Sequence, residues 1–201
     1  MRTKRLVLGL WLLNLAWTLA IFATPLALPA GTVTDLYGRA NIVDHDWSRL
    51  PAFASVVYFL GDLNCHQMAA RSWDVGGNQM PIDARMTAGF VAGNLGIALA
   101  FLVPTMARVR DEAPQILPLT WRARLDSPRR RTLAMGALWA FAAGPLLLDV
   151  ALQGIGLYES TNLRRAWTGG LFGLGVGYLV AVIFDSLMAA PGETGPRPVS
   201  T

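Results

Sequence analysis

The chain has 201 residues, of which 53% are hydrophobic and 15% are charged, and its mean hydropathy is +0.40. This composition excludes an ordinary soluble domain and is typical of a protein embedded in a lipid bilayer. Seven of the 17 basic residues lie in one loop, 107–131, without a basic reading helix or an aromatic platform. We therefore expect membrane lipids as partners and no nucleic acid.

Four apolar runs are long enough to cross the ~30 Å hydrocarbon core, for which roughly twenty helical residues are needed. They predict an all-α polytopic membrane helix bundle with spans at residues 6–28, 86–106, 132–152 and 167–188. The first run follows a basic segment and also fits a cleaved signal peptide. Its apolar stretch exceeds the usual ~7–15 residues of a signal peptide, which favours a retained anchor.

A shorter apolar run, residues 52–63, lies between the first two spans. It is too short to span and predicts an interfacial or re-entrant helix, with a fifth span through residues 52–70 as the alternative. Four spans with a cytoplasmic N-terminus place eleven basic residues inside and six outside, as the positive-inside rule expects. We predict one domain (residues 1–190) in the cell membrane, both termini cytoplasmic, and a disordered cytoplasmic tail (residues 191–201).

Polar residues gather outside the spans on the side opposite the arginine-rich loop. Residues 62–85 hold the sole cysteine, one of the two histidines, two arginines and three aspartates. The string YESTNLRR (residues 158–165) precedes the last span. Together these segments predict a polar outer cap over an apolar bundle.

The single cysteine, Cys65, excludes an intramolecular disulfide. Three interpretations of Cys65 remain open: a buried small residue, a free or intermolecular thiol, or a soft metal ligand beside His66. Asp83 and nearby methionine thioethers would complete a ligand set, which would suit zinc or copper. An adjacent Cys-His pair is by itself a weak metal signal.

Two strings, CHQMAARSWDVGGNQMPIDARMTAGFVAG (residues 65–93) and ESTNLRRAWTGGLFGLGVG (residues 159–177), resemble a family of small prokaryotic membrane proteins catalogued as domain of unknown function 2085. Members carry Cys-His-Gln, Arg-Ser and Pro-x-Cys-Ala-Arg before a glycine-bearing helix, and later Asn-x-x-Arg before a Thr-Gly helix. The resemblance implies that the marked positions here are Cys65, His66, Gln67, Arg71, Ser72, Pro81, Arg85, Asn162, Arg165, Thr168 and Gly169, with Arg164 as the alternative to Arg165 if the spacing slips by one.

One position departs from the family pattern, because Asp83 stands where the family has its second cysteine. Any metal or disulfide chemistry resting on that cysteine would be changed or lost here. The resemblance supports the fold and the place of the site, since the family has no established reaction.

Asp149 lies inside the third predicted span, near its outer end. An ionised carboxylate is costly in lipid, so we expect it to pair with an outer arginine, for either a structural or a functional purpose. Asp185 lies nearer the cytoplasmic side, and we expect it to be solvated. Asn14, in the first span, is expected to form a hydrogen bond between helices. The candidate polar site comprises Cys65, His66, Gln67, Arg71, Ser72, Asp83, Arg85, Asp149, Asn162 and Arg165.

Glycines recur at four-residue spacing in the second and fourth spans, at Gly89 and Gly93 and at Gly169, Gly173 and Gly177. Such spacing lets helix backbones approach closely in a membrane. We therefore expect these two spans to pack together and to bring their outer polar ends into proximity.

Three classes of function fit these features. An enzyme or binding protein would use the polar cap on a lipid or small anionic ligand, with arginines gripping the anion. A transporter would have a re-entrant 52–63 helix and a path past Asp149. A non-catalytic assembly or stabilising subunit would use the cap as an interface with a larger membrane complex.

Overall fold

The structure, a computed structural model, describes residues 2–39 and 42–189, so the tail predicted at residues 191–201 lies outside the described residues. Four of the described helices are long and apolar enough to cross a membrane. This confirms the predicted all-α membrane bundle. The helices are α1 (Arg2–Ala27), α3 (Ala84–Leu99, extended by the 3-10 turn η2, Ala100–Leu102), α6 (Pro128–Gly154) and α7 (Asn162–Met188).

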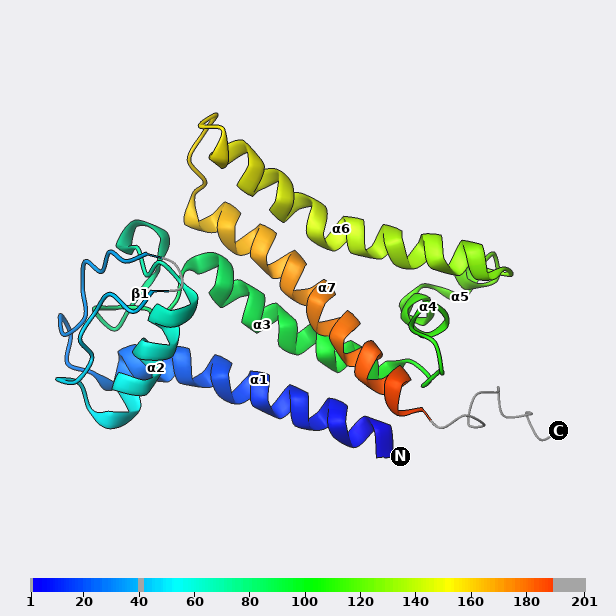
Figure 1. The fold of residues 1–201 in the computed structure, drawn as a ribbon, viewed down its shortest axis with the longest axis horizontal. Coiled ribbons are helices and arrows are strands. Elements are labelled where there is room, and N and C mark those ends of the chain that lie inside the picture. The colour runs from blue at the N-terminus through cyan, green and yellow to red at the C-terminus, as the bar shows by residue number, and fades with distance from the viewer. Residues whose placement is uncertain (1, 40–41, 190–201) are drawn as a thin grey trace.

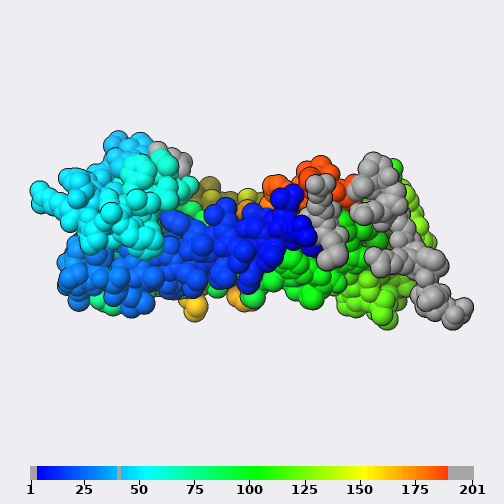
Figure 2. All heavy atoms as spheres, turned by 90° about the horizontal axis from the view of Figure 1, so that it is seen from below, coloured from blue at the N-terminus to red at the C-terminus, as the bar shows by residue number. Residues whose placement is uncertain are grey.

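The long helices lie across the bundle in the order α1, α3, α7, α6 (Figure 1). One end carries the cap, defined here as residues 28–83. The arginine-rich end, opposite the cap, holds the segment 103–127, which connects α3 with α6. Figure 2 shows α1 running along the molecule between these two ends. The connecting segment contains α4 (Val109–Glu112), η3 (Ala113–Ile116) and α5 (Leu119–Arg122).

The short apolar run forms α2 (Ala52–Asn64), which lies in the cap beside the end of α1 (Figure 1). It is shorter than the helices that could cross a membrane. Its Tyr58 is fully buried and stacks on Trp47, with 5.1 Å between the ring centroids. The expected short helix is therefore present, and the fifth-span alternative is not supported.

A two-stranded hairpin, β1 (Asp74–Val75) and β2 (Asn78–Gln79), stands in the middle of the cap. Gly76 and Gly77 make its turn with φ of +67° and +77°. Two successive residues with positive φ are typical of the tight turn that matches strand twist, and glycine adopts them without a steric penalty.

Asn78 joins this hairpin to the end of α1. Its buried Nδ2 donates to the carbonyls of Pro25, Leu28 and Pro29 at 3.0, 3.3 and 3.1 Å. The last carbonyls of a helix lack partners within the helix, so one amide here satisfies a helix end that the cap buries.

Helices α3 and α7 make the closest contact in the bundle, as the glycine spacing predicted. A methyl group built at Gly173 would overlap the carbonyl of Gly89, and one at Gly169 would overlap the carbonyl of Arg85. The two backbones are therefore in direct contact, which fixes the start of α3 beside the start of α7.

Helix boundaries follow the local sequence. Asp83, Ser127 and Thr161 are the N-caps of α3, α6 and α7, and each side chain accepts a backbone N–H of its first turn. The second span, predicted to reach residue 106, ends its helical structure at Leu102. Pro104 follows, and a proline disfavours helical conformation in the residue before it.

Asn14 bridges α1 and α3, as expected, by donating from Nδ2 to the carbonyl of Phe90 at 3.0 Å. Trp11 Nε1 donates to the carbonyl of Asn94 at 3.1 Å, and Asn94 Nδ2 to Thr18 Oγ1 at 2.9 Å. These bonds satisfy polar groups that lipid could not.

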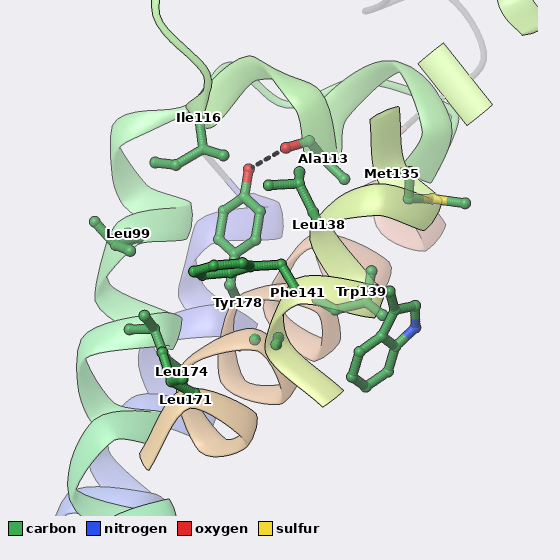
Figure 3. A pocket seen from close by; sticks show the side chains of 13 residues that line it. Leu99, Ala113, Ile116, Met135, Leu138, Trp139, Phe141, Leu171, Leu174 and Tyr178 are labelled. Carbon is green, nitrogen blue, oxygen red and sulfur yellow. Dashed lines mark hydrogen bonds between the residues drawn. The ribbon is translucent and has the colours of Figure 1, made fainter. Parts of the chain in front are cut away.

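An apolar cavity of about 200 Å³ lies between α6 and α7 in the half of the bundle nearer the arginine-rich end (Figure 3). Side chains such as Leu138 and Phe141 line it. Its polar hydroxyl, from Tyr178, already donates to the carbonyl of Ala113 at 2.8 Å. The cavity thus suits a hydrocarbon group and offers little to a polar ligand.

Candidate functional site

Cys65 lies at the end of α2, only 2% exposed, inside the cap. Its Sγ accepts a hydrogen bond from the backbone N–H of Asp83 at 3.3 Å. Burial, followed by the nearby Asp83 charge, raises the pKa of the Cys65 thiol to about 11. A neutral, buried thiol is a poor nucleophile, and the geometry supports the small-residue alternative.

The next two residues of the Cys-His-Gln motif diverge. His66 is exposed, and its backbone carbonyl accepts from the N–H of Gly38 at 2.9 Å. Gln67 is fully buried in a left-handed conformation, and its Nε2 donates to the carbonyls of Tyr58 and Pro81 at 3.0 and 2.8 Å. Gln67 therefore ties α2 to the segment that leads into α3.

The residues predicted as metal ligands do not assemble. Among the described residues, no three His, Cys, Asp or Glu side chains are grouped so that they could hold a metal ion. Asp83 caps α3, with Oδ1 accepting the N–H of Met86 at 2.8 Å. A zinc or copper site at Cys65, His66 and Asp83 stays a prediction without structural support.

Asp149 on α6 is only 5% exposed and forms the centre of a polar network at the cap end. Its carboxylate pairs with the guanidinium of Arg85 and accepts the hydroxyl of Tyr158. Gln153, one turn along α6, donates from Nε2 to the same carboxylate at 2.9 Å. The expected ion pair with an outer arginine therefore forms, and Arg85 is the partner.

Tyr158 belongs to the loop between α6 and α7. The hydrogen bond to the Asp149 carboxylate raises the pKa of the Tyr158 phenol, because that bond requires the protonated form. Tyr158 remains a donor through the neutral pH range.

Arg165 lies in the first turns of α7 and is also only 5% exposed. Its guanidinium donates to Asn162 Oδ1 at 3.3 Å and to Gln153 Oε1 at 3.4 Å, both neutral acceptors. It has no ion-pair partner among the described residues. Asn162 in turn donates to the carbonyl of Ser72 at 3.0 Å, which joins α7 to the cap.

The charges here do not balance. Arg71 and Arg85 repel Arg165, whereas Asp83 and Asp149 attract it. Both carboxylates have other partners, and Arg85 Nε is buried without a hydrogen-bond partner in the described structure. We call this group the cap-end site, and its excess positive charge suits an anion. It consists of Arg71, Arg85, Asp149, Gln153, Tyr158, Asn162 and Arg165.

A groove of about 410 Å³ starts at the cap-end site and follows the contact between α3 and α7. Arg85 and Gly169 line its cap end, while Leu10 and Val180 line its far end. Val180 lies eleven positions after Gly169 on α7, a rise of about 16 Å. Apart from Arg85 and Asn14, the lining is apolar or glycine, so the groove suits a hydrocarbon chain.

Asp185 lies at the arginine-rich end, where the expectation that it is solvated is wrong. It is 0% exposed, pairs with Lys4 Nζ at 2.5 Å and accepts from Thr105 Oγ1 at 2.7 Å. The start of α1 and the segment after α3 cover this end of α7. The position of Asp185 in the sequence does not reveal that these two segments bury it.

Glu112 is fully buried beside Asp185. Its Oε2 accepts from the N–H of Met106 at 2.7 Å and from Ser186 Oγ at 3.1 Å. Burial, with a smaller contribution from the charge of Asp185 and against the opposing bond from Met106, raises the pKa of Glu112 to about 7. Glu112 thus joins the connecting segment to the end of α7.

Sequence reasoning missed Gln153 and Tyr158. Gln153 follows Asp149 by four residues and so shares its helix face, a signal that was available. Tyr158 stood in the polar string before the last span. The contacts of Lys4 and Glu112 with Asp185 join residues more than seventy positions apart, and nothing in the local pattern signals them.

The model of a family described as "Predicted membrane protein (DUF2085)" matches residues 65–179. This range is more than half of the chain and contains every residue of the cap-end site. Neither a curated protein nor a solved structure matches the chain.

Proposed function

Because this chain belongs to the family of predicted membrane proteins catalogued as domain of unknown function 2085, and the match contains the whole cap-end site, we propose that the protein binds an anionic amphiphile. The charged head lies at the cap-end site, and the hydrocarbon tail lies in the groove over α3 and α7. A membrane lipid with a phosphate or carboxylate head has this chemistry.

The observation that carries this proposal is the state of Arg165. A buried guanidinium is costly unless a charge compensates for it, and its acceptors here are the neutral amides of Asn162 and Gln153. Arg85 adds an Nε–H that is buried without an acceptor among the described residues. An anionic head between these arginines would supply both the charge and the acceptors.

The same proposal places the cap on the outer side of the cell membrane, with both termini in the cytoplasm. Support comes from the eleven basic residues on the side of the arginine-rich end, against six on the other side. The amphiphile would then come from the outer leaflet.

The geometry favours binding over bond-breaking chemistry. A nucleophile must lie within hydrogen-bond reach of its base, yet the Cys65 thiol is buried against the backbone of Asp83 and carries a raised pKa. The carboxylate of Asp149 is already held by Arg85 and Tyr158. Neither group is placed as an activated nucleophile.

The test measures the thermal unfolding of detergent-purified protein with short-chain phosphatidylglycerol or with phosphatidylcholine of the same chain length. We expect the anionic lipid to raise the unfolding midpoint more than the zwitterionic lipid. Arg165→Gln should lose that difference, because the buried cation is gone. Arg49→Gln, an exposed cap arginine outside the site, should keep it.

Equal stabilisation of the wild type by both lipids would contradict the proposal. So would an unchanged preference in Arg165→Gln. The midpoint of each variant without lipid shows whether it folds, and Arg165→Lys, which keeps the charge, should retain part of the preference.

A further inference from the structure

The arginine-rich end holds a pocket of about 740 Å³ that is separate from the cap-end site. It lies between the segment after α3 and the start of α6. Its volume falls in the range of roughly 300–1,000 Å³ that is usual for small-molecule sites. The polar residues that line it are Thr105, Arg108, Asp111, Gln115, Arg122 and Arg131.

Two of the three arginines are held in place by neighbours. Arg131 Nη1 pairs with Asp111 Oδ1 at 3.1 Å, and its Nε donates to the carbonyl of Leu125 at 2.9 Å. Arg122 Nη1 donates to Gln115 Oε1 at 2.9 Å. Guanidinium groups fixed in this way lose little conformational freedom when a ligand binds.

The pocket also contains donors without acceptors. Arg122 Nε is buried and has no hydrogen-bond partner among the described residues, and Arg108 is exposed at the pocket. Three guanidinium groups face one carboxylate, Asp111, which Arg131 already engages. The pocket therefore carries an excess of two positive charges.

We propose that this pocket binds the phosphate group of a ligand. Arginine forks match the paired oxygens of a phosphate, which accepts several charge-assisted hydrogen bonds at once. A phosphate oxygen would supply the acceptor that Arg122 Nε lacks, and the phosphate charge would offset the excess. The group belongs to a phospholipid of the adjacent leaflet or to a soluble phosphate compound.

Binding here would also order the connection between helices. Thr105 and Met106 line the pocket, and they hold the buried Asp185 and Glu112. Asp185 in turn pairs with Lys4 on α1. An occupant that fixes this segment would therefore stabilise the ends of α1, α3 and α7 together.

The experiment measures thermal unfolding of the whole detergent-purified chain against rising concentrations of three probes. The probes are inorganic phosphate, pyrophosphate and short-chain phosphatidic acid, each compared with sodium chloride at equal ionic strength because salt screens exposed charges. We expect a saturable rise of the midpoint with at least one probe. Phosphatidic acid is tested in Arg165→Gln, so that binding at the cap-end site does not contribute to the rise. In that variant, a rise with phosphatidic acid alone indicates a lipid source, and a rise with the inorganic probes indicates a soluble one.

Arg122→Gln should weaken the apparent affinity about tenfold, the effect of losing one charge-assisted hydrogen bond. Arg129→Gln removes an exposed arginine of the same region that does not line the pocket, and it should bind as the wild type does. Arg131→Gln is a second pocket variant, for use if Arg122→Gln unfolds without ligand.

No saturable rise with any probe would overturn the proposal. So would equal weakening by Arg122→Gln and Arg129→Gln, which would show diffuse attraction to a basic surface. Arg165→Gln at the cap-end site should leave this binding unchanged, so the two proposals fail or stand separately.

Discussion

Asp149 shows what a carboxylate requires inside a membrane-spanning helix. Three side chains bind it: a guanidinium from α3, a phenol from the following loop, and an amide one turn along its own helix. Without those partners, burial would favour the neutral acid. The network therefore holds the start of α3 against the end of α6.

We predict that Asp149→Asn lowers the free energy of unfolding by about 3 kcal/mol, because it leaves the Arg85 charge partly buried without its counter-ion. Denaturant unfolding in detergent measures the loss. The control is Asp126→Asn, which removes an exposed pair with Arg130 and should cost less than about 1 kcal/mol. Similar losses in both variants would contradict the importance of burial.

Cys65 should be unreactive in the folded protein. Its thiol is buried, and its pKa is raised to about 11, so little thiolate forms at pH 8. Mass spectrometry after treatment with iodoacetamide should find the folded chain almost unmodified and the denatured chain fully modified. Rapid modification without denaturant would show that the cap opens readily.

Glu112 should make stability depend on pH. Its pKa is 4.5 as an ordinary value and about 7 in the fold, so the folded state holds a proton that the unfolded state releases in this range. Its contribution is full below pH 4.5 and is lost as the pH rises to about 7, an effect on the order of 2 kcal/mol. The charges facing it are Asp185 and, through Asp185, Lys4.

The wild type should therefore lose more stability than Glu112→Gln between pH 4.5 and 7, as measured by denaturant unfolding at several pH values. The variant lacks the titrating group, and other groups cancel in the comparison. Parallel curves for the two proteins would contradict the raised pKa.

At the scale of elements, the contact between α3 and α7 organises the bundle. Gly89, Gly93, Gly169, Gly173 and Gly177 line this contact, which we call the seam. Because glycine has no side chain, the starts of the two helices meet there and Arg85 lies close to Arg165. This approach positions the cap-end site and also forms the floor of the groove. A small-residue seam thus serves the site as well as the packing.

We predict that Gly173→Ala destabilises the protein by roughly 1–3 kcal/mol or prevents folding, because the new methyl group would overlap the carbonyl of Gly89. Gly136→Ala on α6 is the matched control, with nothing within 4 Å of the added group. It should be neutral or slightly stabilising, since alanine favours a helix. Thermal unfolding of both variants tests this prediction. An equal change of the unfolding midpoint in the two variants would contradict the close contact between α3 and α7.

At the scale of the whole molecule, the charged side chains concentrate at the two ends of the bundle. The cap-end site and the phosphate pocket lie at opposite ends of the bundle. Both proposals therefore place anionic ligands near the two surfaces of the membrane. Their orientation depends on which end faces the cytoplasm.

The orientation can be measured with single cysteines, because Cys65 is the sole cysteine and Cys65→Ser yields a cysteine-free parent. In that parent, Tyr37→Cys in the cap, where the native residue is 75% exposed, should react with a membrane-impermeant maleimide in intact cells. Arg124→Cys should react only after permeabilisation. The reverse pattern would place the cap inside.

Much of the fold follows from the sequence by itself. Apolar runs of sufficient length must be helical in lipid, because every backbone polar group needs a partner. The glycine spacing in α3 and α7 predicted their contact. The position of Asp149 inside a span predicted its ion pair with an arginine. These inferences rest on local composition and on the bilayer as solvent, so one chain sequence suffices for them.

Tertiary structure alone decided which polar residues share a site. Cys65, His66 and Gln67 are consecutive, yet Cys65 and Gln67 are buried and His66 is exposed, so neighbours in sequence do not form a ligand group within the described part of the chain. Lys4, Glu112 and Asp185 are distant in sequence and meet because the connecting segment folds over the helix ends. Hydropathy specifies how deep a residue lies in the membrane, whereas contacts within one depth depend on helix rotation and loop paths, which only the packed fold determines.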